Sequence, residues 1–291
     1  MKSLCVEPKD DGKKLITFLS SSFPSLNINY IYKALRKKDI KINNNRINTN
    51  VSLSSGDIID IYISDEYLYN LKNLQIPIIY EDDNIVVFNK PANLEVVGNN
   101  SLTSMMKNDY TFLEPCHRID RNTIGLVLFA KNQSSLDVLL GKFEKSEIEK
   151  HYIACCYGNP NKKQDTIYSF LFKDNKKSIV YISDIPKKGY VPTKTSYSIL
   201  KSKDKISLLD ITLHTGKTHQ IRANLAHIGL PIIGDGKYGS YAVNKMFKAN
   251  YQMLCSYSLK FNFETDSTYL NYLNGLTISL KSIPFLDMIK N

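Results

Sequence analysis

The sequence predicts an α+β protein in two parts: a small helix-rich domain, followed by a larger domain built mainly of strands. Residues 11–38 carry two amphipathic helical patterns, and a hairpin pattern follows them. Beyond these, apolar runs separated by turn residues dominate, with few short helical patterns. The 291 residues suffice for one large or two ordinary domains. We place the first domain at 12–65, a linker at 66–76 and the second domain at 77–291.

Composition points to a polyanionic partner. The chain has 38 Lys and Arg against 28 Asp and Glu, a net charge of +10, and this excess does not choose between nucleic acid and membrane. Its five cysteines form no CxxC pair, so neither a disulfide framework nor a zinc site is indicated. The N-terminus lacks the apolar core of a signal peptide, and no apolar run approaches the roughly 18 residues of a membrane span. We expect a reduced, cytoplasmic protein with no membrane partner.

In the first domain, apolar residues at helical spacing predict helices around Leu15–Leu19 and Ile28–Leu35. Asn27 is placed to cap the second helix. The Asn-rich centre of residues 40–48, set between alternating apolar residues, predicts a hairpin, and residues 56–63 predict a strand.

Basic residues crowd the second helix and the hairpin, with only Asp39 opposing them. They are Lys33, Arg36, Lys37, Lys38, Lys41 and Arg46. Phosphate contacts of such a face add affinity but no sequence information. A solvated lysine face would have the same composition.

The second domain opens with strand, acidic turn, strand and a Lys-Pro stop at residues 76–94, which predicts a hairpin. The stretch CHRIDRNTIGLVLFAK then sets Asp120 between Arg118 and Arg121, just before an apolar strand. Nearby positive charge lowers a carboxylate pKa by about one to three units. Asp120 is therefore expected to be ionised, and to act as a nucleophile or an electrostatic stabiliser. A surface salt-bridge cluster is the alternative.

Further along, residues 135–143 predict a short amphipathic helix. The next strand, EKHYIACCYG, alternates so that Tyr152 and its second neighbours share one face. Residues 160–204 are rich in lysine and turns, and predict short antiparallel strands with solvated connections.

Residues 206–239 predict a strand ending near His214, a Thr-Gly turn and a helix closed by Gly229. Arg222 falls near the start of this helix with His219 on its face, aimed away from the core, where it could meet a carboxylate. The three histidines of this segment do not share a helical face, and no metal site is expected.

Three motifs in order resemble those of the RluA family of RNA pseudouridine synthases, and the resemblance spans about residues 12–280. HRIDRNTIGLVLFAK is similar to the central motif HRLDxxTSGLLLFAK, with Ile119 and Ile124 as departures. IIYEDDNIVVFNKPANL is similar to IIYEDDxxLVVNKPAGL, with Asn93 in place of glycine. LHTGKTHQIRANLAHIGLPIIGDGKYG is similar to LxTGRTHQIRxHLAxxGHPIxGDxxYG, with Lys217 in place of arginine.

The resemblance implies roles for individual residues. Asp120 would be the catalytic aspartate, Arg222 its ionic partner and Tyr152 the aromatic ring against the target uracil. Substrate contacts are implied or expected for Arg118, which would fill the space left by a flipped base, and for Arg121, His219, Leu225 and Lys217. Lys217 keeps the charge of the usual arginine but lacks the planar guanidinium group, so a bidentate contact with a phosphate is not expected there. Leu225 would line the pocket wall.

The resemblance also implies a fold and a reaction. The catalytic domain would have a mixed, mostly antiparallel sheet with flanking helices, and the basic first domain resembles an S-four-type RNA-binding domain. The enzyme would be an isomerase that converts RNA uridine to pseudouridine without a cofactor. Large-subunit ribosomal RNA is the favoured partner, with transfer RNA as the alternative, and we expect a monomer. Whether Asp120 forms a covalent adduct or opens a glycal route is left open.

Two other classes of protein remain as alternatives. One is a non-catalytic RNA-binding ribosome assembly factor, against which the presence of Asp120, Tyr152 and Arg222 argues. The other is a glycosidase or nucleosidase, which needs a second, proton-donating carboxyl group. Asp210 and Asp235 are the candidates, but no spacing pairs either with Asp120.

Overall fold

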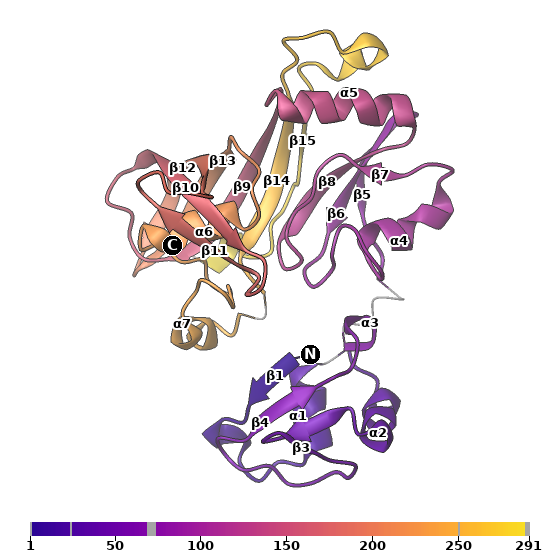
Figure 1. The fold of residues 1–291 in the computed structure, drawn as a ribbon, viewed down its shortest axis with the longest axis vertical. Coiled ribbons are helices and arrows are strands. Elements are labelled where there is room, and N and C mark those ends of the chain that lie inside the picture. The colour runs from indigo at the N-terminus through magenta and orange to yellow at the C-terminus, as the bar shows by residue number, and fades with distance from the viewer. Residues whose placement is uncertain (1, 24, 69–73, 250, 289–291) are drawn as a thin grey trace. The chain divides into compact units, whose positions relative to one another are not determined.

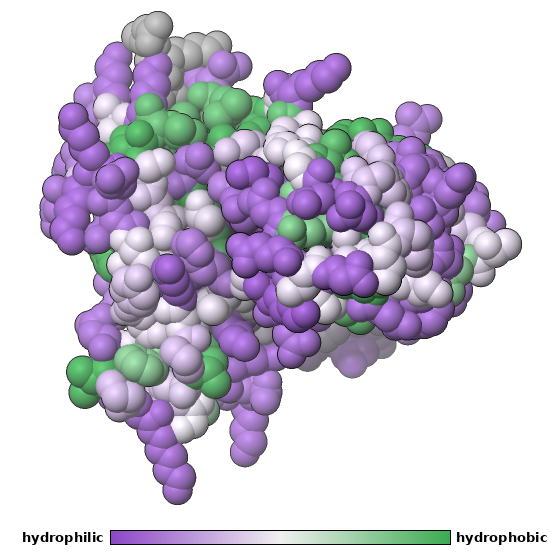
Figure 2. Space-filling view, turned by 90° about the horizontal axis from the view of Figure 1, so that it is seen from above, coloured by the Kyte–Doolittle hydropathy of each residue, from purple (hydrophilic) through white to green (hydrophobic). Residues whose placement is uncertain are grey.

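The computed structural model describes residues 2–23, 25–68, 74–249 and 251–288. The chain divides into two compact units, residues 1–75 and 76–291, which are described separately (Figure 1). Within the described ranges, no helix is long and apolar enough to cross a bilayer. One face of the molecule is shown in Figure 2, where hydrophilic side chains predominate and apolar ones form smaller groups.

The first unit is a four-stranded antiparallel sheet packed with short helices. The strand order is β1-β4-β2-β3, with bounds Lys2–Cys5, Ile58–Ile61, Ile40–Ile42 and Asn45–Arg46. The helices are α1 (Leu15–Ser22), α2 (Ile28–Lys37) and α3 (Asp65–Leu68), with a 3₁₀ turn at Pro8–Asp10. The predicted helices, hairpin and strand are confirmed. Strand β1 was not predicted, and residues 69–73 of the proposed linker lie outside the described residues.

Local sequence explains this unit. The Asn27 side chain accepts a hydrogen bond of 2.9 Å from the Asn29 N–H at the start of α2, as its capping role requires. Asn43 and Asn44 form the hairpin turn with φ values of 49° and 67°, a conformation that asparagine tolerates well. The unit has its own core of fully buried side chains, which include Leu15, Leu19, Ile31, Ile40, Ile59 and Ile61.

The second unit is built on one large sheet. Its main strand order is β11-β10-β12-β13-β9-β14-β8-β6-β5, with β15 beside β14 and β7 beside β8. The bounds are β5 Ile78–Glu81, β6 Ile85–Lys90, β7 Glu114–Pro115, β8 Ile124–Ala130, β9 Ile148–Tyr157, β10 Gln164–Asp174, β11 Ile179–Ser183, β12 Val191–Lys203, β13 Ile206–Leu213, β14 Leu254–Phe261 and β15 Thr277–Ser279. Only β14 and β8 pair in parallel among the described strands, so the predicted mixed, mostly antiparallel sheet is confirmed.

Helices flank this sheet in Figure 1. They are α4 Leu102–Met106, α5 Gln133–Glu144, α6 Gln220–His227 and α7 Tyr241–Met246, with 3₁₀ turns at Lys107–Asp109, Thr268–Leu273 and Leu286–Met288. The region 160–204 differs from its prediction, because β10 and β12 run for 11 and 13 residues rather than forming short strands. Buried residues alternate along both strands, which gives each of them an inward face to pack.

The parallel pairing of β8 with β14 determines the position of the pocket. In β14, Cys255 lies opposite Ile124 of β8 and also opposite Ile153 of β9. The two backbones approach closely at Gly125, where a Cβ atom would lie 2.2 Å from the carbonyl oxygen of Ser256. Only glycine fits at this position, which also has a φ of 113°. The loop before β8 is thereby held near the middle of β9.

Candidate active site

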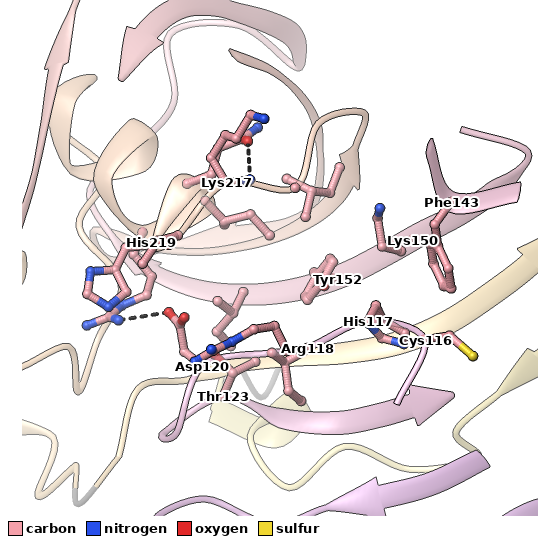
Figure 3. A pocket seen from close by; sticks show the side chains of 18 of the residues that line it. Cys116, His117, Arg118, Asp120, Thr123, Phe143, Lys150, Tyr152, Lys217 and His219 are labelled. Atoms are coloured by element: carbon pink, nitrogen blue, oxygen red, sulfur yellow. Dashed lines mark hydrogen bonds and ion pairs between the residues drawn. The ribbon is translucent and has the colours of Figure 1, made fainter. Parts of the chain in front are cut away.

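A pocket of about 400 Å³ lies among the loop before β8, strand β9, and the segment from β13 into α6 (Figure 3). Six of the residues predicted for the site line it: Arg118, Asp120, Tyr152, Lys217, His219 and Arg222. They come from segments about 100 residues apart in the chain, and the structure brings them together.

Asp120 is at the surface of this pocket and is paired with Arg222. The Nη1 atom of Arg222 donates a hydrogen bond of 2.8 Å to Oδ2 of Asp120. The Asp120 side chain keeps 22% of its surface exposed, whereas that of Arg222 keeps 7%. The carboxylate thus faces the pocket with the guanidinium on its protein side, and the predicted ion pair between these two residues is present.

Arg222 is held from its other edge by Asp235. Its Nε and Nη2 atoms donate to the two oxygens of Asp235 at 2.7 and 2.9 Å. Asp235 also accepts from the backbone N–H groups of Lys237 and Tyr238, at 2.8 and 3.1 Å. Burial alone would raise the pKa of Asp235, but the hydrogen bonds from Arg222 outweigh it and hold the pKa below its usual value. Burial likewise opposes the charge of Arg222, yet its two carboxylate partners raise its pKa.

These contacts correct two expectations. Arg222 is not aimed away from the core, because it is buried between two carboxylates. Asp235, considered above as a proton donor for a glycosidase, is an ionised partner of Arg222 and is 1% exposed. The other candidate, Asp210, accepts from the Tyr257 hydroxyl at 3.3 Å and is not among the residues that line the pocket. The motif GDGKYG contains Asp235, but the spacing of residues in the sequence does not show that Arg222 is its partner.

His219 is held in one orientation by Tyr238. The backbone N–H of Val180 donates to the Tyr238 oxygen at 2.8 Å, so the hydroxyl proton is free to point to Nδ1 of His219, also at 2.8 Å. Burial lowers the pKa of His219 to about 4. The ring is then neutral, with Nδ1 as acceptor and the proton on Nε2. The Tyr238 ring also lies 5.2 Å from the guanidinium carbon of Arg222, within cation–π range.

Tyr152 forms part of the pocket floor. It is paired with Ile211 of β13 on one side and Ser256 of β14 on the other, so strands fix its position. The side chain is buried, and burial raises the pKa of its hydroxyl above the usual value. Leu213 and Leu254 line the same pocket and give it an apolar surface beside the phenol ring.

The two arginines that flank Asp120 differ in their position relative to the pocket. Arg118 lies 3.8 Å from the carboxylate of Glu95, and its side chain is 66% exposed at the pocket. Arg121 does not line the pocket, and its Nε donates to the Asn93 carbonyl at 3.3 Å. Asn93 has a φ of 65°, as predicted for a residue in a glycine position. The ion pair of Asp120 is made by Arg222, from a distant segment.

Lys90 is a residue that the sequence analysis missed. Its side chain is fully buried, and Nζ donates to the carbonyls of Pro91, Leu94 and Arg121 at 2.8, 2.7 and 3.0 Å. Burial lowers its pKa to about 7. Because Arg121 follows Asp120 directly, Lys90 ties the loop that carries the aspartate to the end of β6.

The remaining predicted site residues are distributed differently. Leu225 is fully buried and does not line the pocket, since α6 turns it toward the core. Lys217 is exposed at the pocket, and its backbone N–H donates to Oε1 of Gln220 at 3.1 Å. Gln220, another missed residue, also donates from Nε2 to the Thr195 hydroxyl at 2.9 Å. It therefore fixes the loop before α6 against β12.

The basic residues of the first unit are mostly solvent-facing. Lys33, Arg36, Lys37, Lys38 and Arg46 are exposed, and Lys41 is half-buried. Arg46 donates to the Lys38 carbonyl at 3.4 Å, and Lys41 lies 5.3 Å from the centre of the Tyr62 ring. The helix and the hairpin thus present their positive charges to solvent.

Comparisons with known proteins give a consistent result. A family model described as RNA pseudouridylate synthase matches residues 84–227. The ribosomal large subunit pseudouridine synthase C of Buchnera aphidicola subsp. Acyrthosiphon pisum is 32% identical over 263 residues, covering 83% of this chain and 82% of that protein. An uncharacterized RNA pseudouridine synthase of Mycoplasma capricolum is 30% identical over 302 residues, covering 96% and 97%.

Among solved structures, human RNA pseudouridylate synthase domain containing 1 is similar with a TM-score of 0.61 and 20% identity, over 74% of this chain and 86% of that one. The structure of human RNA pseudouridylate synthase domain containing 4 gives a TM-score of 0.58 at 21% identity, over 72% of this chain and 89% of that one. At these identities the likeness concerns the fold.

Proposed function

Because the chain belongs to the RNA pseudouridylate synthase family, we propose that Asp120 carries out its isomerisation of uridine to pseudouridine, with large-subunit ribosomal RNA as the target. The family gives the reaction; the residues and the target are the proposal. The ion pair between Asp120 and Arg222 on the surface of the pocket is the observation that carries it.

The reaction sets clear demands on the pocket. The bond from ribose C1′ to uracil N1 breaks, the base turns and C1′ bonds to C5. The proton of C5 leaves and N1 gains a proton, so the product is an isomer of uridine. No electrons are gained or lost overall, so the isomerisation calls for no redox cofactor. The base must first leave the RNA stack, at a cost of a few kcal/mol that is smallest for an unpaired base. We assign to Arg118, which is exposed at the pocket, the role of filling the space that the base leaves.

Asp120 needs to be oriented toward the substrate, and Arg222 supports this. The short hydrogen bond from a guanidinium that is itself held by Asp235 fixes the direction of the Asp120 carboxylate. An ionised Asp120 can attack the sugar or the base ring, or can remove a sugar proton to open a glycal route. Because the Asp120 side chain is partly exposed at the pocket, it is accessible to both the sugar and the base of the substrate.

Tyr152 offers a face for the flipped uracil. Stacking of a base on an aromatic ring contributes about 1–3 kcal/mol. Because burial raises the pKa of Tyr152, its hydroxyl stays protonated at neutral pH, which favours stacking and hydrogen-bond donation over direct proton removal from C5. His219 adds a neutral donor at Nε2, and Lys217 adds a positive charge.

Target choice rests on the relatives and on the first unit. Several relatives are named as ribosomal large subunit pseudouridine synthases, which favours ribosomal over transfer RNA. The exposed cations of the first unit would hold RNA phosphates without reading sequence. We place this RNA-processing step in the cytoplasm, carried out by a monomer; the free cysteines, four of them buried, fit a reducing compartment.

The decisive experiment measures tritium release from uracil C5 in ribosomal and transfer RNA transcripts, with the wild type and Asp120→Asn in parallel. Release by the wild type alone, with equal RNA binding by both proteins, is the expected result. Normal turnover by Asp120→Asn would contradict the assignment of Asp120. Binding by the wild type without release from any transcript would favour an assembly factor instead.

A further inference from the structure

The pocket extends beyond the residues assigned so far, toward Lys150. This lysine lies two residues before Tyr152 in β9, so both side chains are on the same face of the strand. Figure 3 shows Tyr152 between Asp120 on one side and Lys150, Phe143 and His117 on the other. Lys150 Nζ lies 5.2 Å from the centre of the Phe143 ring. The pocket therefore has a cationic end away from the Asp120–Arg222 pair.

Lys150 is half-buried, and unlike the buried Lys142 and Lys90 its ammonium group makes no hydrogen bond or ion pair with a described residue. Lys142 pairs with Glu147 at 2.7 Å, and Lys90 donates to three carbonyls. Among the described residues, no carboxylate lies within 4.0 Å of Lys150; the adjacent Glu149 pairs with His151 at 3.1 Å. Burial lowers the pKa of Lys150, because its ammonium group has lost part of its contact with water.

The groups around Lys150 leave its charge unopposed. Glu144 lines the same pocket but is exposed and more than 4.0 Å away. His117 adds no charge, since burial and the nearby Lys150 lower its pKa to about 3. Across the pocket, a methyl group added at Gly216 would lie 3.9 Å from Lys150 Nζ, so the turn before Lys217 borders the ammonium. The Lys217 backbone N–H donates to Gln220 and is therefore already engaged.

We propose that Lys150 forms a phosphate subsite of the pocket and binds the RNA phosphodiester next to the flipped uridine. The inference rests on the proposed function, because it takes the base to lie on Tyr152. With the base stacked on Tyr152, Lys150 is the next residue on the same face of β9. The sugar-phosphate backbone that joins the extruded nucleotide to its neighbour can pass beside it. Charge-assisted hydrogen bonds are about twice as strong as neutral ones, so an ammonium without a counter-ion gains more from a phosphate than from a neutral uracil carbonyl.

Salt dependence of binding tests the proposal. The probe is an RNA stem-loop with one unpaired uridine, and its Kd is measured from low to high KCl with the wild type, Lys150→Met, Lys150→Arg and Lys260→Met. Loss of one phosphate contact on single-stranded RNA makes the slope of log K against log salt shallower by about 0.7. We expect that change, with weaker binding at low salt, for Lys150→Met only. Lys150→Arg keeps the charge, and Lys260 is an exposed lysine of β14 outside the pocket.

A second measurement changes the RNA and compares the wild type with Lys150→Met. The two phosphates flanking the unpaired uridine are replaced in turn by uncharged methylphosphonate. One replacement should weaken binding to the wild type and have no further effect on Lys150→Met. Equal sensitivity of both proteins, or an unchanged salt slope for Lys150→Met, would overturn the proposal. If Lys150→Met keeps the wild-type salt slope but loses the preference for uridine over cytidine, Lys150 contacts the base and not a phosphate. That outcome would also overturn the proposal.

Failure of the proposed function has a different signature. In that case no transcript releases tritium with the wild type, whatever the slopes show. In such a protein, phosphate-dependent binding through Lys150 would still support the subsite. The function would be refuted by the missing tritium release.

Discussion

Asp120 and Asp235 share one guanidinium, that of Arg222, which donates one hydrogen bond to the first carboxylate and two to the second. The two carboxylates are therefore in different environments. Asp235 is enclosed and fully engaged, whereas Asp120 keeps an edge free at the pocket. In the proposed mechanism Asp235 is a positioning residue and Asp120 the catalytic one.

Asp235→Asn should lower kcat by about ten- to a hundredfold with little change in KM, because Arg222 loses the anchor that aims it at Asp120. Removing one partner of a buried ion pair also costs about 3–5 kcal/mol of folding stability, and the amide should reduce this cost by keeping some hydrogen bonds. Single-turnover rates and Tm measure the two effects. Asp184→Asn is the matched control, since Asp184 is a 78% exposed partner of His227. Unchanged kcat in Asp235→Asn would mean that Arg222 needs no second carboxylate.

Arg118→Ala should impair turnover chiefly on structured RNA. If Arg118 fills the space left by the flipped base, its loss raises the cost of flipping, which is a few kcal/mol for a paired base and much less for an unpaired one. We expect a drop of at least tenfold for a uridine inside a helix and a small effect for the same uridine in a bulge. Equal losses on the two substrates would show that Arg118 acts through another step, such as overall RNA binding.

His219 should make the protein less stable in acid. Its pKa is about 4 in the folded protein and near 6.5 when unfolded, so the unfolded chain binds more protons between these values. The stability associated with neutral His219 is therefore complete above pH 6.5 and declines as the pH falls toward 4. Urea unfolding at pH 7.5 and pH 5 should show a larger loss for the wild type than for His219→Gln. A loss of the same size in both proteins would assign the acid sensitivity elsewhere, for example to His117.

Neutralising the basic face of the first unit should reduce RNA affinity without altering the pocket. In the full chain, the triple change Lys33→Gln, Arg36→Gln and Lys37→Gln removes three exposed charges of α2. Each lost phosphate contact makes the salt slope shallower by about 0.7 for a single strand, so a change of up to about 2 is expected on single-stranded RNA, with kcat at saturating RNA retained. A slope equal to that of the wild type would show that this face is solvated and does not hold RNA.

Much of this architecture was predictable because its signals are local. The capping Asn27, the Asn43-Asn44 turn and the buried strand after Asp120 depend on neighbouring residues, and each formed as predicted. Sequence motifs likewise brought Asp120 and Arg222 into one hypothesis although they are 102 positions apart.

What could not be predicted depends on packing between distant segments. The burial of Arg222 follows from the position of Asp235 after α6, which helical periodicity does not report. Leu225 falls outside the pocket for the same reason, because the direction of α6 against the sheet decides which face is open. For Lys150, only the fold shows that it lines the pocket and that no described carboxylate lies within 4.0 Å of it.

The position of β14 between β8 and β9 has a consequence for biosynthesis. Asp120 is carried by the strands on one side of β14, and Tyr152 and Arg222 come from the other side. A ribosome that has just reached Met253 has already made every side chain invoked in the chemistry, but not the strand that joins the two groups. The nascent chain therefore lacks the strand that joins the two groups until residues 254–261 have left the exit tunnel, and the pocket can form only after that point.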